Sequence, residues 1–258
     1  MILVRLLALF LVMVSTAAAT PAPAPSLRVM SYNVNHANRD VAGTLDAIAG
    51  ADADVVLIQE VDSDWKDALA KRFAKVYPHR AFRITARAAG GLAVLSKHPI
   101  SDEELLPTPP EGWFPAQRLV VDGPFGKVQM LNLHLRPNLD SGGWITGYQT
   151  TPPHRLAQAK SYFPRLAAGL PTIIAGDFNE LPTGLAMEFF AKQGLARVPT
   201  KGPTTWHHQK IVGGKPMSLL SMDIDHILVD STFAASDAVV LDAGASDHRP
   251  VVVTLHKK

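Results

Sequence analysis

The sequence predicts an α/β sandwich with mixed β-sheets, formed by one large domain. Short apolar, β-branched runs alternate with helical patterns in the first part of the chain, as expected for sheets flanked by helices. Closely spaced strand patterns dominate the middle and the end of the chain, and these favour antiparallel hairpins. The combination favours mixed sheets over a doubly wound parallel sheet. A chain of 258 residues, 47% of them hydrophobic, can bury a sizeable core.

The first residues are predicted to form a separate targeting segment. Residues 1–19 resemble a secretory signal peptide, because the run from Met1 to Val14 is almost wholly apolar and small alanines at 17–19 suit cleavage. An uncleaved membrane anchor is the alternative, although the run is short for a membrane span. Residues 20–26, with three prolines, form a predicted spacer. The folded domain is expected at 27–258, secreted or periplasmic, with no transmembrane segment in the mature chain.

Composition narrows the chemistry. The chain has no cysteine, which excludes disulfides, thiolate metal sites and a lipoprotein anchor. The formal net charge is only +2, so there is no global bias toward polyanions. No obligate protein partner is evident.

Each predicted element has a local reason. The strand at 27–33 alternates, and the helix at 40–49 has apolar residues at helical spacing. Pro164 must end or kink the helix that starts at 154. The segment 138–153, rich in Gly, Thr and Pro, is expected to be a long loop. The other predicted elements are strands at 54–60, 91–96, 172–175, 222–229, 234–241 and 250–255, a hairpin of 119–122 with 127–135, helices at 63–73 and 184–193, and strand or loop at 203–208.

Polar residues follow several of these buried strands. The central example is the strand 172–175, after which Gly176 opens a turn and Asp177 and Asn179 follow. A continuing extended backbone would point these two side chains the same way, whereas a purely structural Asx turn is the alternative. Asn33, Glu60 and the loop of Asp247 end other strands in the same manner. Strand ends gathered at one edge of packed sheets make a cleft.

The chemistry of these residues suggests a hard cation and acid–base groups. Carboxylate and amide oxygens without thiolates select Mg²⁺, Mn²⁺ or Ca²⁺. Asp225 lies among apolar residues and needs a partner, for which His248 is the predicted choice. An Asp–His pair serves as a general base or as a clamp on a phosphoryl oxygen. His134, in a strand pattern, is a further candidate.

Each candidate also has a structural interpretation. Glu60 could be a strand-end acid in water, His134 a core histidine, Asp225 a turn acid, and Asp247 with His248 a loop cap. The basic stretch 71–87 is predicted to be a solvated face rather than a phosphate site, and His207 and His208 are expected in a loop. These structural interpretations would have to hold together at five sites, which makes a shared functional site the better hypothesis.

Seven segments together resemble the endonuclease/exonuclease/phosphatase superfamily, the DNase I-like group, in its order and from about Leu27 to Leu255. The most specific are Gly-Asp-Phe-Asn at 176–179 and Ser-Asp-His at 246–248. The other five are Met30-Ser-Tyr-Asn-Val34, Leu57-Ile-Gln-Glu-Val61, the segment 91–100, Leu131-Asn-Leu-His134 and Asp223-Ile-Asp-His-Ile227. The resemblance implies a four-layer α/β sandwich with two packed mixed β-sheets flanked by helices, and Mg²⁺-dependent cleavage of phosphate esters, with Mn²⁺ or Ca²⁺ as alternatives.

The resemblance also implies roles for single residues. Glu60 matches the principal metal ligand, with Asn33 and Asp247 beside it. Asp177 and Asn179 match the residues that place the attacking water and bind the scissile phosphate. The remaining matches are His248 with Asp225 as base or phosphate clamp, His134 as a second active-site histidine, and Arg118 as a substrate-binding arginine. Asn35 stands where the AP endonucleases carry an aspartate, which weakens a second metal contact.

The resulting expectation is a metal-dependent phosphodiesterase, nuclease-like, that uses in-line attack by water. A phospholipid (sphingomyelinase-like) or inositol phosphate hydrolase is the alternative, and nucleic acid or a phosphorylated head group is the expected substrate. The sequence has no hydrophobic hairpin long enough for the membrane insertion typical of secreted bacterial sphingomyelinases, although Trp144 in the long loop could touch lipid. A non-catalytic binding module on the same fold is the alternative from another class, although every expected ligand type is present.

Overall fold

Two six-stranded sheets form the centre of the protein in the computed structural model, which describes residues 24–110, 112–212 and 215–258. The first sheet contains β1 (Leu27–Asn33), β2 (Val55–Gln59), β3 (His79–Arg83), β4 (Leu92–Ser96), β13 (Phe233–Val240) and β14 (Val251–Lys257). The second contains β5 (Ile100–Leu106), β6 (Ala116–Gly123), β7 (Gly126–His134), β8 (Thr172–Asp177), β9 (Ala196–Arg197) and β12 (Asp225–Val229). A separate hairpin pairs β10 (Trp206–Val212) with β11 (Lys215–Met222).

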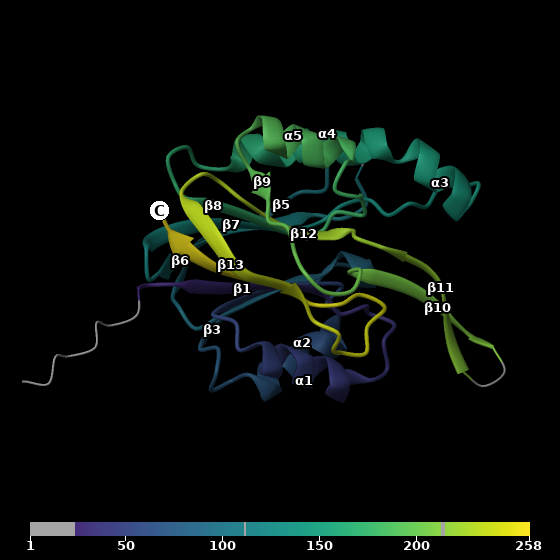
Figure 1. The fold of residues 1–258 in the computed structure, drawn as a ribbon, viewed down its shortest axis with the longest axis horizontal. Coiled ribbons are helices and arrows are strands. Elements are labelled where there is room, and N and C mark those ends of the chain that lie inside the picture. Colours follow the sequence, from purple (N-terminus) through teal and green to yellow (C-terminus); the bar gives the residue numbers. More distant parts are fainter. Residues whose placement is uncertain (1–23, 111, 213–214) are drawn as a thin grey trace, which may run out of the picture.

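Helices cover the outer faces of both sheets (Figure 1). One face carries α1 (Val41–Ala51) and α2 (Ser63–Arg72), and the other carries α4 (Pro152–Tyr162) and α5 (Leu185–Lys192), with α3 (Trp144–Thr150) beyond them. Two short 3₁₀ turns, η1 (Ala88–Gly90) and η2 (Phe163–Arg165), complete the elements.

The strand order explains why both sheets are mixed. The first sheet runs β13-β14-β1-β2-β4-β3 and the second β5-β6-β7-β8-β12-β9. Only β1 with β2 and β7 with β8 pair in parallel, and the other neighbours are antiparallel. The predicted α/β sandwich with two packed mixed sheets is therefore confirmed.

Three apolar cores hold the four layers together. Successive residues of β1 alternate between them: Val29 packs between the sheets, whereas Met30 packs toward α1 and α2. A third core joins the second sheet to α4 and α5, with Phe178 and Phe190 among its members. Both faces of the central strands are thus buried, which is why their sequences are continuous apolar runs.

The structure corrects several expected elements. The segment 138–153 is not all loop, because it contains α3, whose Thr146 and Thr150 hydroxyls donate to Asp140. The helix expected from 154 begins at Pro152 and ends at Tyr162, where the 3₁₀ turn with Pro164 follows. The expected loop residues His207 and His208 lie in β10. The strands β3, β5, β9 and β11 have no counterpart among the predicted elements.

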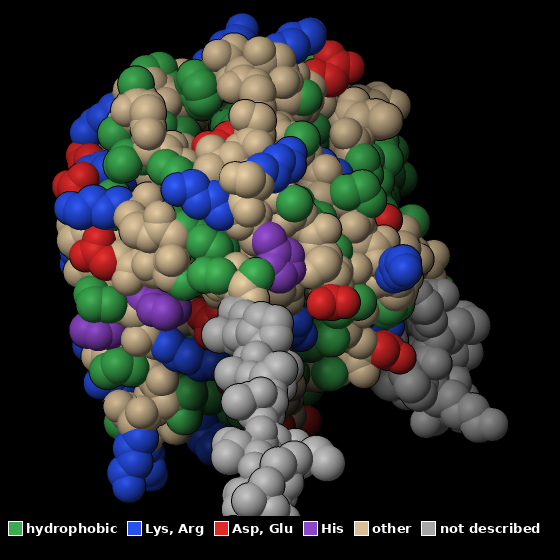
Figure 2. All heavy atoms as spheres, turned by 60° about the vertical axis from the view of Figure 1, so that its left-hand side comes forward, with side chains coloured by type: hydrophobic (Ala, Val, Ile, Leu, Met, Phe, Trp, Pro, Cys, Tyr) green, Lys and Arg blue, Asp and Glu red, His purple; other side chains and the backbone are tan. Residues whose placement is uncertain are grey.

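The surface is mixed in character. Basic, acidic and apolar side chains are interspersed on the face shown in Figure 2, in keeping with a net charge of +2. None of the helices in the described part of the chain has the length and apolar character needed to cross a membrane. The predicted signal peptide, 1–19, lies outside the described residues.

Candidate active site

The strand ends of both sheets meet at one edge of the sandwich. Asn33 ends β1, and Glu60 directly follows β2 in the first sheet. In the second sheet His134 ends β7, Asp177 ends β8 and Asp225 begins the antiparallel β12. The last three are cross-strand neighbours in register, so they form one row across the sheet edge. The predicted gathering of polar strand ends is therefore what the fold produces.

A tight approach of two strands fixes the position of Asp177. Gly176 has φ of +152°, and a Cβ there would lie 1.8 Å from the carbonyl oxygen of Leu133, so only glycine fits. Asn179 then adopts φ of +50°, and its backbone N–H donates to Asp177 Oδ1 at 2.8 Å. The expectation of extended backbone through Asn179 is therefore wrong. The stretch is an Asx turn and still carries its polar side chains at the site.

Asp177 lies at the centre of the polar cluster. Its Oδ2 accepts from Asn33 Nδ2 at 3.0 Å, and the Nε2 atoms of His134 and His248 lie at 3.5 Å and 3.6 Å. The side chain is almost completely buried. Burial, together with the charge of Asp225, raises the pKa of Asp177 to about 6, although both histidines oppose the rise.

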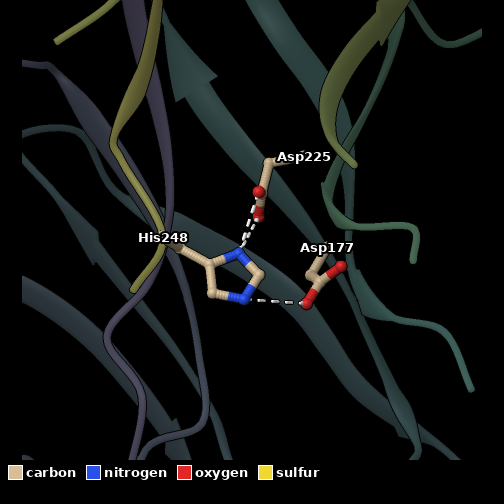
Figure 3. A group of neighbouring side chains, drawn as sticks. All are labelled: Asp177, Asp225 and His248. Atoms are coloured by element: carbon tan, nitrogen blue, oxygen red, sulfur yellow. Dashed lines mark hydrogen bonds and ion pairs between the residues drawn. The ribbon is translucent and has the colours of Figure 1, made fainter. Parts of the chain in front are cut away.

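His248 lies between two carboxylates (Figure 3). Its Nδ1 faces both carboxylate oxygens of Asp225, at 2.9 Å and 3.1 Å, and its Nε2 faces Asp177. Burial alone would lower the pKa of His248, but Asp225 and Asp177 outweigh it and raise that pKa to about 10. The predicted Asp225–His248 pair is present, and it holds the ring as an imidazolium with Nε2–H directed at Asp177.

Glu60 belongs to a second group beside this row. Its Oε1 accepts from Asn33 Nδ2 at 3.0 Å, and its Oε2 lies 2.6 Å from His36 Nδ1. The backbone of Glu60 is left-handed, with φ of +60°, which directs its side chain away from the ordinary strand course. Burial would raise the pKa of Glu60, but His134, His36 and Asn33 hold it below its usual value. Glu60 is therefore ready to act as an anionic ligand.

Asp247 is oriented by neutral donors. Asn35 Nδ2 donates to its Oδ1 at 2.7 Å and Trp206 Nε1 to its Oδ2 at 3.1 Å. His134 is oriented through the backbone, since its Nδ1 donates to the carbonyl oxygen of Ala89 at 3.1 Å. Nε2 of His134 is thereby the nitrogen that faces Asp177.

These side chains surround a cleft of about 350 Å³. Six predicted site residues line it: Glu60, His134, Asp177, Asn179, Asp247 and His248. Asn33 and Asp225 lie directly behind them and bond to Asp177 and His248. Arg118 is not brought to the cleft, because its guanidinium pairs with Asp102 at 2.9 Å and Glu104 at 3.5 Å. The expected substrate contact of Arg118 is thus corrected.

The structure adds residues that the sequence reasoning missed. His36 contacts Glu60 and lines the cleft, as do Arg87, Trp113 and Trp206. Arg87 comes from the stretch 71–87 that was expected to be a solvated face. His36 lies three residues after Asn33, the end of β1, so its proximity to a polar strand end is the one signal that could have indicated it.

The donor set suits a divalent cation. Three carboxylates, from Glu60, Asp177 and Asp247, line a single cleft, and their mutual repulsion favours a counter-ion. The donor atoms are oxygens, with imidazole nitrogens beside them, which suits Mg²⁺ or Mn²⁺. Asp177, Asp225 and His248 also offer ligand atoms within 4.8 Å of one another, close enough to hold a metal. Both ring nitrogens of His248 face carboxylates, however, which favours an imidazolium over a metal ligand there. Glu60 with Asn33 and Asp247 offers an alternative set of oxygen donors.

Comparisons of structure give the same fold. An endonuclease/exonuclease/phosphatase from Beutenbergia cavernae superposes with a TM-score of 0.69 at 24% identity, over 90% of this chain and 72% of that chain. Sphingomyelinase C from Streptomyces griseocarneus gives 0.66 at 19% identity, over 89% and 99% of the two chains. The human Nocturnin catalytic domain gives 0.67 at 17% identity, over 92% and 96%.

Comparison of the sequence with family models identifies the protein family. None of the curated proteins searched matches the sequence. The model of the "Endonuclease/Exonuclease/phosphatase family" matches residues 30–248, a span that starts just before Asn33 and ends on His248. This span holds every residue of the cleft described above. The chain belongs to the endonuclease/exonuclease/phosphatase family.

Proposed function

We propose that this protein is a Mg²⁺-dependent hydrolase of phosphate esters, and that it acts on phosphodiesters in a nuclease-like manner. The observation that carries the proposal is the position of His248, whose ring is held between Asp225 and Asp177 on the wall of the cleft that Glu60 also lines. An imidazolium and ionised carboxylates in one water-accessible cleft suit the charge changes of phosphoryl transfer.

In this proposal, the residues of the cleft have two roles, proton transfer and charge stabilisation. Asp177, with a pKa of about 6, accepts a proton from the attacking water at neutral pH. Asn179 lies on the same turn and orients the phosphate. His248, held as an imidazolium by Asp225, shares its Nε2–H between Asp177 and a phosphoryl oxygen as negative charge develops. As the bond from water to phosphorus forms, the opposite bond to the leaving oxygen breaks.

Glu60, Asn33 and Asp247 would hold the cation in this proposal. A bound Mg²⁺ supplies Lewis-acid stabilisation of the phosphoryl and leaving oxygens. Mn²⁺ and Ca²⁺ take the same oxygen ligands and are the alternative cations.

A phospholipid hydrolase is the second candidate, favoured by apolar side chains at the rim of the cleft. Trp144 lines the cleft and is 42% exposed, and its neighbour Ile145 on α3 is 76% exposed. Apolar and aromatic side chains beside a phosphate site suit the interface of a lipid layer. A phosphatase acting on inositol phosphates would need no such rim.

The test is hydrolysis of bis-p-nitrophenyl phosphate with Mg²⁺, after EDTA, and after Mg²⁺ is restored. We expect EDTA to abolish the rate and His248→Ala to lower it by at least about 100-fold, while His98→Ala, outside the cleft, leaves it unchanged. A panel of plasmid DNA, RNA, sphingomyelin and inositol phosphates at low and moderate salt then identifies the natural class. Failure of every substrate would overturn the hydrolase in favour of a non-catalytic binding module.

The place of action is part of the proposal. The apolar segment 1–19 supports export to the periplasm or the medium by a cleaved signal peptide. Expression of the full chain in a Gram-negative host, followed by N-terminal sequencing of the periplasmic fraction, tests it. A protein that keeps Met1 and stays with the membrane would instead be anchored.

A further inference from the structure

One wall of the cleft is formed by an arginine and a tryptophan that have no role in the proposed hydrolysis. Arg87 Cζ lies 5.1 Å from the ring centroid of Trp113, and Arg136 Cζ lies 5.2 Å from the same centroid. Arg87 and Trp113 both line the cleft. Two guanidinium groups therefore share one indole ring beside the candidate active site.

This wall is joined directly to the hydrolytic residues. Arg87 precedes η1, and its carbonyl oxygen accepts from Thr85 Oγ1 at 2.6 Å and from the Gly90 N–H at 2.7 Å. The next residue but one, Ala89, accepts the Nδ1 hydrogen bond of His134. On the facing segment, Phe114 stacks on the His134 ring with centroids 4.3 Å apart. The segment that carries Arg87 therefore also contacts His134, through Ala89. The segment that carries Trp113 contacts His134 as well, through Phe114.

Arg87 carries the one guanidinium among the described residues that line the cleft, and no lysine is among them. Its guanidinium carbon lies over the indole ring of Trp113 and, within the described part of the chain, the group forms no ion pair. A guanidinium held by an aromatic ring keeps N–H groups available, and such a group binds phosphate with two parallel hydrogen bonds.

We propose that Arg87, supported by Trp113, binds a second phosphate group of the substrate, separate from the phosphate that is cleaved. The inference rests on the proposed hydrolase and deepens it by assigning the substrate to esters that carry at least two phosphates. It disfavours a phosphocholine head group, because a choline cation near Trp113 would be repelled by the Arg87 guanidinium.

Binding is measured first, because it does not depend on turnover. Calorimetry compares thymidine 3′,5′-bisphosphate with thymidine 5′-monophosphate, and inositol trisphosphate with inositol monophosphate. A charge-assisted pair of hydrogen bonds predicts about 10- to 100-fold tighter binding of the ligand with the additional phosphate. Arg87→Gln is expected to remove most of this preference and Arg87→Lys to keep part of it. Arg80→Gln, an exposed arginine of β3 outside the cleft, is the matched control and keeps the preference.

Hydrolysis is then compared for the dinucleotide TpT and its forms with a 5′- or 3′-terminal phosphate, with sphingomyelin as a further substrate. We expect a higher kcat/KM for one of the phosphorylated forms, and Arg87→Gln to bring the ratio close to one. Equal binding and equal kcat/KM with and without the additional phosphate, or a preference for sphingomyelin, would overturn the second phosphate site while leaving the hydrolase intact. A binding preference that Arg87→Gln removes, in a protein that hydrolyses nothing, would support the site and overturn the hydrolase.

Discussion

Arg155 and Glu180 form an ion pair of 3.1 Å in which both side chains are almost completely buried. Arg155 projects from α4, and Glu180 directly follows the turn that carries Asp177 and Asn179. Glu180 Oε2 also accepts from the Ala186 N–H at the start of α5. The pair therefore ties two outer helices to the turn at the floor of the candidate active site.

Removing one partner of this pair is expected to destabilise the protein strongly. Arg155→Met would leave Glu180 buried without its counter-charge, at a cost of about 3–5 kcal/mol in the free energy of unfolding. Urea denaturation measures it. Lys192→Met breaks the exposed pair of α5, Lys192 with Glu188, and should cost less than about 0.5 kcal/mol. Equal losses in the free energy of unfolding for the two variants would show that the buried pair stabilises the protein no more than the exposed pair does.

His36 is expected to support metal binding through Glu60. Loss of its 2.6 Å contact with Glu60 Oε2 should weaken the binding of Mn²⁺ by about 10- to 100-fold, as for other residues that orient a ligand. Isothermal titration calorimetry of His36→Ala with Mn²⁺ tests this, and His98→Ala serves as the control. An unchanged dissociation constant for His36→Ala would place the cation away from Glu60.

Asp225 is expected to act only through His248. Asp225→Asn removes the charge that holds the imidazolium, and kcat on bis-p-nitrophenyl phosphate should fall by about 10²- to 10⁴-fold. The double variant Asp225→Asn/His248→Ala should be no slower than His248→Ala alone, since the two residues form one unit. Additive losses would instead mean that Asp225 has a role of its own. Far-UV circular dichroism checks that each variant is folded.

His226 predicts how stability depends on pH. Its Nε2–H donates to the carbonyl oxygen of Glu180 at 2.8 Å, and its Nδ1 accepts from Arg197 Nε at 3.0 Å. Burial lowers the pKa of His226 to about 3, so the folded protein keeps the ring neutral. The unfolded chain takes up a proton below pH 6.5, and stability therefore falls as the pH decreases from 6.5 toward 3.

At pH 5 the loss due to His226 is about 2 kcal/mol relative to pH 7.5. Urea unfolding at the two pH values measures it. His226→Gln can make the same two hydrogen bonds without titrating, so its stability should vary less with pH by that amount. Identical pH dependence in both proteins would assign the acid sensitivity to other groups.

The strand ends of the site could be predicted because each follows an apolar run. Apolar runs of buried strands commonly give way to polar residues at their ends, so Asn33, Glu60 and Asp177 were identifiable from the sequence. The pairing of Asp225 with His248 followed from the cost of burying an unpaired acid. These inferences needed only local pattern and elementary energetics.

The remaining contacts depend on geometry that the pattern does not encode. Arg118 was expected at the substrate, but its side chain meets Asp102 and Glu104 of the neighbouring strand β5, a pairing set by sheet register. His36 reaches Glu60 because Asn35, the residue before it, adopts a φ of +54°. Asparagine can adopt this left-handed conformation, but the sequence alone does not predict it here. Within the segment expected to be loop, the hydrogen bonds of Thr146 and Thr150 to Asp140 accompany the helix α3.

The row of His134, Asp177 and Asp225 across β7, β8 and β12 has a consequence for how such a protein can diversify. Each of the three is fixed by main-chain pairing inside the sandwich, whereas Arg87, Trp113 and Trp144 reach the cleft from segments outside the sheets. Insertions or exchanges in those outer segments can therefore change which molecule is admitted without moving the reacting groups. A one-residue insertion within β8 would turn the carboxylate of Asp177 to the opposite side of the sheet and end the chemistry.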